Sequence, residues 1–306
     1  MKEGLAIGVD IGGGSIRVGV YNVKGVELRK AVSPTPKNLN NDSFLNTLKT
    51  TISAVWENNE SYTGIGVGSP GPLDNERGIF IASANMKGIN NVPIKDFLER
   101  EFKIPCSYEN DANCAALGEA YFGNFQSASS LLILTLGTGL GGGFVEAGKL
   151  YSGYLGNGIE IGHTTAVFDG RLCGCGQRGC VEAYFSTEAF KGSYLEKTGT
   201  QLKDAKEFFE RLDANDPIAF EILKFGTLAL AHAVRGAIHL LNPEAVVFVG
   251  GITNSYNKFG VDLESRIRSL IFPILNDRLK IGVGSGFSGS LGAAGLVFSK
   301  RGIRNG

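Results

Sequence analysis

Apolar residues follow two periods along this chain, and these predict strands alternating with helices. Short apolar runs are typical of strands, and they occur at residues 5–9, 16–20, 26–31, 64–68, 106–108, 131–136, 144–145, 245–249 and 280–283. Apolar residues at helical spacing predict helices at residues 95–102, 112–122, 187–197, 202–212, 217–241, 261–268 and 290–298. A further helix carries Phe44, Leu48 and Ile52 on one face, and Asp42 is its expected N-cap. This order predicts an α/β protein with mixed sheets.

The length and an internal repeat predict two halves. A chain of 306 residues suggests about two domains, on a prior of roughly 150 residues each. The order at residues 5–25 is an apolar strand, a glycine turn, a second strand and a turn with lysine and glycine, and it recurs at residues 131–149. A repeated order of this kind predicts two related halves that offer glycine turns to one ligand from opposite sides.

Composition and charge narrow the class of protein. The hydrophobic share of 43% and the charged share of 20% are ordinary for a soluble globular protein. Thirty basic residues balance thirty acidic ones without a basic run, which argues against nucleic acid or an anionic membrane as partner. The N-terminus lacks the apolar segment of a signal peptide, and the uncharged residues 128–145 contain five glycines, so we expect a strand and a loop there rather than a membrane span. Five cysteines, an odd number, favour a reducing compartment, so we expect a cytoplasmic protein.

Three of the five cysteines lie with a histidine in one segment, EIGHTTAVFDGRLCGCGQRGCVE, at residues 160–182. The candidate metal ligands are His163, Cys173, Cys175 and Cys180. Three thiolates and one imidazole make a closed tetrahedral set, which is the ligand count of a structural zinc site. Scattered cysteines are more often buried thiols, but the glycines between these ones let a short backbone bring the sulfurs together. Zinc is therefore the preferred interpretation.

Glycine turns follow three of the predicted strands. They comprise Gly12, Gly13 and Gly14 with Ser15; Gly137, Thr138 and Gly139; and Gly250 with Gly251. Glycine lets backbone N–H groups approach phosphate oxygens without a side-chain clash, so the repeated turns predict binding of nucleotide phosphates. None of them has the Walker A pattern, and the strand residues behind the second turn argue against a Rossmann dinucleotide site.

Two acids stand at strand ends near these turns. Asp10 precedes the first glycine turn, where it either holds Mg²⁺ through water or caps its own turn. Asp111 precedes a predicted helix, where it either accepts the proton of a substrate hydroxyl that attacks a γ-phosphate or simply caps the helix.

Several polar or glycine positions are suited to binding a polyol, although each alone is more often an ordinary surface residue. They are Asn110, Glu160 and Glu182, with Asn85 and Gly71 at loop positions that would complete such a pocket.

Taken together and in order, the motifs of this chain resemble those of ROK-family sugar kinases, within the actin-like ATPase superfamily. They are DIGGGS at 10–15, SPGPLD at 69–74, END at 109–111, LGTGLGGG at 136–143, EIGH at 160–163, CGCGQRGCVEAY at 173–184 and VGGI at 249–252. They cover nearly the whole chain, and the flanks of the cysteine segment are most similar to those of bacterial glucokinases.

The resemblance implies a two-lobed actin-like (ribonuclease H-like) fold with ATP and sugar in the cleft between the lobes. The smaller lobe would comprise residues 1–117 with about 288–306, and the larger one residues 118–287, including the zinc segment. ATP phosphates, with Mg²⁺, would lie on the turns at 12–14 and 137–139, and the nucleotide would reach toward Gly250 and Gly251.

The resemblance also implies roles for single residues. Asp111 would be the catalytic base. The implied sugar contacts are Asn110, Glu160, His163 and Glu182, and His163 would bind zinc together with the three cysteines. Two departures bear on the substrate: Gly14 and Ser15 stand where the family usually has threonine followed by lysine or asparagine, and Ile89 lies near the place of a glucokinase tryptophan.

The predicted activity is ATP-dependent phosphorylation of a hexose, with glucose to glucose 6-phosphate as the first choice. The alternatives are a kinase for fructose, N-acetylmannosamine or N-acetylglucosamine, and a polyphosphate-dependent glucokinase. A sugar-responsive repressor is disfavoured because no DNA-binding helix-turn-helix precedes the first strand. A dimer or tetramer is usual for the family, so a homo-oligomer is expected.

Overall fold

The computed structural model describes residues 4–83, 86–287 and 289–300 and divides into two compact units. The first unit comprises the described parts of Met1–Ser129, Gly143–Ile159 and Phe287–Gly306, and the second comprises Ser130–Gly142 and Glu160–Gly286. The α/β class with mixed sheets is confirmed, whereas the predicted lobe boundaries stay a prediction.

The first unit is built on a five-stranded sheet with the order β3-β2-β1-β4-β8. Its strands are β1 (Leu5–Ile11), β2 (Ser15–Tyr21), β3 (Glu27–Pro34), β4 (Tyr62–Ser69) and β8 (Cys106–Asn110). β1, β4 and β8 run parallel, while β2 and β3 are antiparallel neighbours on one side. The carboxyl ends of the three parallel strands therefore meet at one edge of the sheet.

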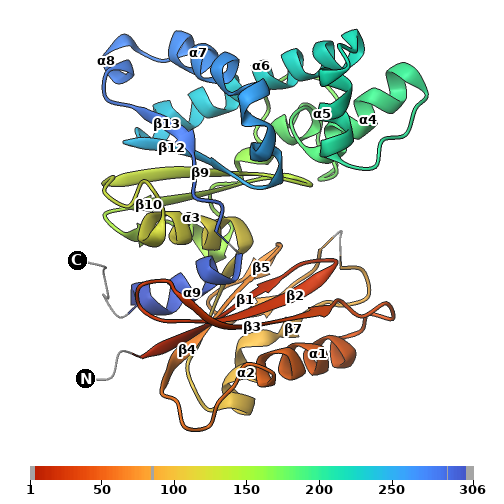
Figure 1. Cartoon of the computed structure of the whole chain (residues 1–306). Helices are drawn as coiled ribbons and strands as arrows, with labels where there is room; N and C mark the ends of the chain where they lie inside the picture. Colours follow the sequence, from red (N-terminus) through yellow and green to blue (C-terminus); the bar gives the residue numbers. More distant parts are fainter. Residues whose placement is uncertain (1–3, 84–85, 288, 301–306) are drawn as a thin grey trace. The chain divides into compact units, whose positions relative to one another are not determined.

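Helices cover both faces of this sheet. Those of the first unit are α1 (Asn41–Ser53), α2 (Ile94–Phe102), α3 (Asp111–Phe122) and α9 (Gly289–Lys300). Figure 1 shows α1 and α2 on one face and α9 on the other, where α9 packs against β1 and β4 and also against α3. Two strand glycines permit this close packing: a Cβ would stand 1.8 Å from the Ser290 carbonyl oxygen at Gly8, and 1.8 Å from that of Ala293 at Gly66.

The start of α1 differs from the prediction. Asn40, not Asp42, is the N-cap, because the Asn40 side chain accepts a hydrogen bond from the Ser43 backbone N–H at 2.9 Å. The Ser43 hydroxyl accepts one in return from the Asn40 backbone N–H at 3.1 Å, which completes a capping box. Asp42 lies in the first turn, where its negative charge favours the helix N-terminus.

Short elements that carry little sequence signal complete the first unit. A small antiparallel sheet has the order β5-β6-β7, and a two-pair hairpin joins the end of β10 to β11. These elements are β5 (Leu73–Asp74), β6 (Ile79–Phe80), β7 (Val92–Pro93), β10 (Leu140–Glu146), β11 (Lys149–Leu150) and the 3₁₀ turn η1 (Tyr154–Gly156). β10 begins in the second unit and ends in the first.

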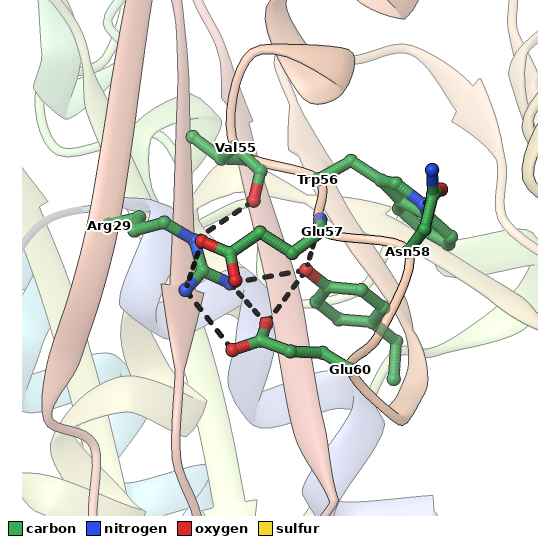
Figure 2. A network of polar contacts seen from close by, with 7 residues as sticks. Arg29, Val55, Trp56, Glu57, Asn58 and Glu60 are labelled. Carbon is green, nitrogen blue, oxygen red and sulfur yellow. Dashed lines mark hydrogen bonds and ion pairs between the residues drawn. The ribbon is translucent and has the colours of Figure 1, made fainter.

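An arginine-centred network ties β3 to the segment between α1 and β4 (Figure 2). Arg29 donates to the Val55 carbonyl oxygen at 3.1 Å and forms ion pairs with Glu57, at 3.2 Å, and Glu60. The Tyr62 hydroxyl donates to the same Glu60 carboxylate at 2.9 Å. The Arg29 hydrogen bond holds the pKa of Glu60 below its ordinary value.

The second unit is organised around three parallel strands in the order β9-β12-β13. They are β9 (Ser130–Leu136), β12 (Ala245–Val249) and β13 (Lys280–Val283). Its helices, seen above these strands in Figure 1, are α4 (Thr187–Thr198), α5 (Ala205–Asp213), α6 (Pro217–Leu241), α7 (Gly260–Leu270) and α8 (Pro273–Asn276). Three 3₁₀ segments connect them: η2 (Ile161–His163), η3 (Val181–Ala183) and η4 (Gly251–Lys258).

The helix α6 is the central helix of the second unit. Its 25 residues begin after the N-cap Asp216, whose carboxylate accepts from the Ile218 backbone N–H at 2.8 Å. Among the described helices, α6 is the one whose length and apolarity would allow it to cross a membrane. However, 56% of its most apolar window is buried in the protein, and it packs against α4, α5 and α7, as the core helix of a globular unit does.

Candidate active site and metal cluster

The carboxyl edge of the first sheet brings several predicted residues together. Asp10 lies near the end of β1 and pairs with Gly68 on β4, while Ser69 pairs with Asn110 at the end of β8. Gly71 lies two residues after the end of β4, and a Cβ at this position would stand 3.5 Å from the Asn110 side-chain nitrogen. The local sequence explains the gathering, since each motif follows a strand and the three strands are parallel.

Asp10 is a mostly buried carboxylate beside the first glycine turn. Burial raises its pKa, and Arg17, whose guanidinium lies 3.5 Å away, opposes the rise. In the described part of the chain, Arg17 is the charged partner of this carboxylate. The turn itself is closed by a hydrogen bond from the Gly12 backbone N–H to the Ser15 carbonyl oxygen at 2.9 Å, and a Cβ at Gly14 would meet nothing within 4 Å.

Asp111 is the first residue of α3, and Asn110 is the N-cap. The Asn110 side-chain oxygen and one Asp111 carboxylate oxygen each accept from the Ala112 backbone N–H at 2.8 Å. The helix is therefore capped by Asn110, and the exposed Asp111 stands at the positive end of the helix dipole. This geometry places the Asp111 carboxylate at the sheet edge.

The buried thiol of Cys114 is influenced by three acids of this edge. Burial raises the pKa of Cys114 well above its ordinary value, and the negative charges of Glu109, Asp111 and Asp10 raise it further. The three carboxylates thus lie close enough to this buried thiol to raise its pKa, and Cys114 stays protonated and unreactive.

The four predicted metal ligands of the second unit converge. One ligand atom from each of His163, Cys173, Cys175 and Cys180 lies within 4.8 Å of all the others. The Cys175 and Cys180 sulfurs are 3.6 Å apart, and the Cys173 sulfur is 3.7 Å from His163 Nδ1. A tetrahedral centre with Zn–S of about 2.3 Å and Zn–N of about 2.0 Å separates two sulfurs by about 3.8 Å and sulfur from nitrogen by about 3.5 Å. The donor set therefore fits zinc.

The backbone around the cysteines is held by its own hydrogen bonds. The Cys173 backbone N–H donates to the Gln177 carbonyl oxygen at 2.8 Å, and the Gly176 N–H returns to the Cys173 carbonyl oxygen at 2.9 Å. Gly179 has a φ of +82°, and a Cβ there would stand 1.8 Å from the Val167 carbonyl oxygen. Glycine is required at this position, because both the left-handed backbone and the close approach exclude a side chain.

Glu182 links the metal cluster to the second glycine turn. One of its carboxylate oxygens accepts from the Leu140 backbone N–H at 2.8 Å, and the other lies 3.7 Å from the Cys173 sulfur. A Cβ at Gly139 would stand 2.4 Å from the former oxygen. Glu160 lies in the same neighbourhood, where burial raises its pKa, His163 lowers it and Glu182 raises it.

The second and third glycine turns also lie in the second unit. The Gly137 backbone N–H donates to the Gly139 carbonyl oxygen at 3.0 Å, and the Thr187 N–H at the start of α4 donates to the Gly137 carbonyl oxygen at 2.9 Å. Gly250, with a φ of +103°, lies against the end of β9, so a Cβ would stand 2.5 Å from the Leu136 carbonyl oxygen. Gly251 begins η4.

The predicted site residues thus form one group in each unit. The first-unit group is Asp10, Gly12, Gly13, Gly14, Ser15, Gly71, Asn110 and Asp111, and the second-unit group is Gly137, Thr138, Gly139, Glu160, His163, Cys173, Cys175, Cys180, Glu182, Gly250 and Gly251. Asn85 lies outside the described residues. The sequence interpretation missed Arg17 and Glu109, although Glu109 stood inside the END motif, and their partners become visible only in the folded sheet.

Comparison with known proteins agrees with this geometry. The family model described as "ROK family" matches residues 6–299. The glucokinase of Thermotoga maritima is 35% identical over 95% of this chain and 96% of its own length. The N-acetyl-D-glucosamine kinase of Pasteurella multocida is 32% identical over 97% of this chain and 100% of its own.

A solved structure supports the same assignment. A ROK-family glucokinase from Streptomyces griseus, in complex with glucose and AMPPNP, has a TM-score of 0.77, is 28% identical and covers 96% of this chain and 98% of its own. The resemblance noted from the motifs is thereby confirmed across nearly the whole length. The chain belongs to the ROK family.

Proposed function

We propose that this protein is an ATP-dependent hexose kinase that converts glucose to glucose 6-phosphate. The observation that carries the proposal is the placement of Asp111 at the N-terminus of α3, on the same sheet edge as Asp10 and Asn110. The names of the relatives and the glucose and AMPPNP of the Streptomyces griseus structure support it.

In the proposed reaction Asp111 is the general base. As the sugar hydroxyl oxygen attacks the γ-phosphorus, the bond from phosphorus to the bridging oxygen of ADP breaks, and the hydroxyl proton passes to the Asp111 carboxylate. Mg²⁺, held through water by Asp10, would neutralise the charge on the phosphate oxygens. The turns at 12–14 and 137–139 would supply backbone N–H groups to the phosphates, and the nucleotide would extend toward Gly250 and Gly251.

We propose that the sugar contacts Asn110, Glu160, His163 and Glu182, with Gly71 and Asn85 completing the pocket. If His163 Nδ1 ligates zinc, Nε2 carries the proton and can donate it to a sugar hydroxyl. N-acetylglucosamine is the second candidate substrate, because a relative of that name matches nearly the whole chain at almost the same identity.

A coupled ADP-release assay with MgATP tests the reaction and the sugar together. The panel would include glucose, fructose, mannose, N-acetylglucosamine and N-acetylmannosamine, with polyphosphate as an alternative donor. We expect the highest kcat/KM with glucose and ATP. No ADP release with any sugar would refute the kinase assignment, and a preference for N-acetylglucosamine would refute glucose alone.

The assignment of the base is tested by Asp111→Asn. We expect kcat to fall by about 10²- to 10⁴-fold, because the amide cannot accept the proton, while KM for ATP stays within about twofold. Asp96→Asn is the matched control, since Asp96 occupies the first turn of α2 in the same unit and should leave kcat unchanged. A near-normal kcat in Asp111→Asn would remove its proposed role.

We further propose that the metal cluster holds one structural zinc ion that shapes the sugar pocket. All four positions are protein ligands, so the metal has no open site for activating water. Cys175→Ser should lower bound zinc from about one equivalent, measured by elemental analysis, and remove the tetrahedral thiolate absorption of the Co²⁺-substituted protein. Cys106→Ser, at a buried cysteine of the first unit, is the control and should retain both. Full zinc content in Cys175→Ser would contradict the ligand assignment.

The compartment and the oligomeric state stay proposals as well. A reducing compartment such as the cytoplasm agrees with five cysteines that the structure describes outside any disulfide. A homo-oligomer is proposed from the family alone, and sedimentation velocity would test it.

A further inference from the structure

Glu109 is a buried carboxylate of β8 that the proposed reaction does not use. The Glu109 residue as a whole is 3% exposed to solvent, and it directly precedes Asn110 and Asp111 in the chain. One of its oxygens accepts from the Asn110 backbone N–H at 2.9 Å and from the Asn113 side-chain amide at 3.0 Å. The other accepts from the Asn75 side-chain amide at 3.0 Å and from the Ser152 hydroxyl at 2.7 Å.

These four donors fill the acceptor capacity of the carboxylate, which has about four lone-pair sites. Glu109 therefore has no site left for a ligand, and a proton acceptor at this position would have to break one of the four bonds. Its role must lie in what the bonds hold in place. A buried charge without a cation is costly unless it is hydrogen-bonded, so the four donors and the carboxylate depend on one another.

The donors come from three segments of the first unit. Asn110 and Asn113 flank Asp111 on either side, one at the end of β8 and one in the first turn of α3. Asn75 follows β5 and Ser152 follows β11, so the second oxygen anchors the carboxylate to two loops. The same loops are bonded to each other, because the Asn157 side chain donates to the Leu73 carbonyl oxygen at 3.1 Å.

We propose that Glu109 is a positioning residue that sets the direction of Asp111 and Asn110 toward the substrate. The inference rests on the proposed kinase function. Asp111 lies between two groups that the same carboxylate oxygen holds, so it cannot shift along the sheet edge without breaking one of those bonds. A misplacement of about 1 Å costs on the order of 10²-fold in rate, which gives this constraint a measurable effect.

Glu109→Gln is the decisive change because it keeps the shape of the side chain and replaces one of its two acceptor oxygens by an NH₂ donor. The amide NH₂ would face donors, which leaves at least one buried donor without a partner. We expect kcat to fall by about 10- to 100-fold, while KM for ATP stays within about twofold. Glu119→Gln is the matched control: Glu119 is 2% exposed, lies in the same α3 and is remote from Asp111, so its kcat should stay within about twofold of wild type.

A rescue separates positioning from a general loss of folding. In Asn75→Asp combined with Glu109→Gln, the carboxylate introduced by the first change accepts from the amide introduced by the second, so the bond is restored with its polarity reversed. We expect kcat to recover at least threefold over Glu109→Gln alone. Folding of each variant is followed by the fluorescence of Trp56, the single tryptophan, which lies in the first unit.

Each outcome decides one question. If wild type phosphorylates no sugar, the proposed function fails, whatever Glu109 does. If wild type is active and folded Glu109→Gln keeps a kcat within about twofold, the positioning role is refuted. Should Glu109→Gln not fold, the double variant Asn75→Ala, Ser152→Ala removes only the second-oxygen donors; we expect at least a fivefold lower kcat, and an unchanged kcat would overturn the inference.

Discussion

Gly66 on β4 offers a quantitative test of how α9 closes the first unit. A Cβ at this position would stand 1.8 Å from the Ala293 carbonyl oxygen and 2.7 Å from its carbon, both backbone atoms of α9. Ordinary contact begins at 3.4 Å, so the helix would have to retreat by about 1.6 Å in Gly66→Ala. A side chain could rotate away, but a helix backbone moves as a whole.

The loss in the free energy of unfolding follows from the apolar contacts that this movement of α9 would loosen. Leu291, Ala294, Val297 and Phe298 of α9 are buried with Ala6 and Tyr21 in one apolar cluster, which a retreat would open. Overpacking of a well-packed core costs about 1–3 kcal/mol, and we expect about 3 kcal/mol here because backbone meets backbone. At about 2–4 °C per kcal/mol, the midpoint temperature of this unit should fall by roughly 6–12 °C.

Trp56 makes the measurement specific to the first unit. It stacks on Tyr62, with ring centroids 4.5 Å apart, and packs 5.1 Å from Phe102, so its fluorescence reports the unfolding of this unit. Urea titrations of Gly66→Ala are compared with Gly14→Ala, where a Cβ meets nothing within 4 Å and the free energy of unfolding should stay within about 0.5 kcal/mol. If Gly66→Ala is as stable as this control, the close approach of α9 is not what requires glycine.

Two further changes test the charged network of Figure 2 and the link between turn and metal cluster. Glu60→Gln should lower the free energy of unfolding by about 1 kcal/mol at pH 7, and its difference from wild type should shrink as the pH falls. Because the pKa of folded Glu60 lies below the ordinary 4.5, its contribution is present above that value and is lost as acid protonates it; a pH-independent difference in urea midpoints would contradict this. Gly139→Ala should displace the Glu182 carboxylate, because a Cβ there would stand 2.4 Å from one of its oxygens. We expect the sugar KM to rise by about tenfold, since the proposed hydrogen bond from the sugar to this charged group is worth about 1.5 kcal/mol. Gly137→Ala, which meets nothing within 4 Å, is the control, and an equal KM in the two variants would argue against Glu182 as a sugar contact.

Much of the fold could be predicted where the signal is local. The apolar runs at residues 245–249 and 280–283 coincide with β12 and β13, and residues 217–241 coincide with α6, whose ends carry Asp216 and Asn242. The strand β10 was predicted only at residues 144–145 and runs over Leu140–Glu146, because its three glycines lack side chains that would reveal a period. The helix α5 begins at Ala205 rather than at residue 202, since Asp204 is its N-cap.

The candidate site likewise contains residues that the sequence identifies and contacts that it does not. The ligands of the metal cluster could be named from the sequence because four residues of rare types lie within 18 positions. The contact of Glu182 with the Leu140 backbone joins positions 42 apart, and the bond of Ser152 to Glu109 joins positions 43 apart. Such partners depend on tertiary packing, and the spacing of residues along the chain does not encode them.

The packing of α9 on β1 also constrains the order in which the two units can fold during synthesis. Gly8 lies against Ser290, so the opening strand waits for a partner that the ribosome adds about 280 residues later. At about 5–20 residues per second, this interval lasts roughly 15–60 s. During it the nascent sheet keeps one apolar face uncovered, while the entire second unit emerges and can fold between the two parts of the first. The first unit to begin synthesis is thus the last to be completed.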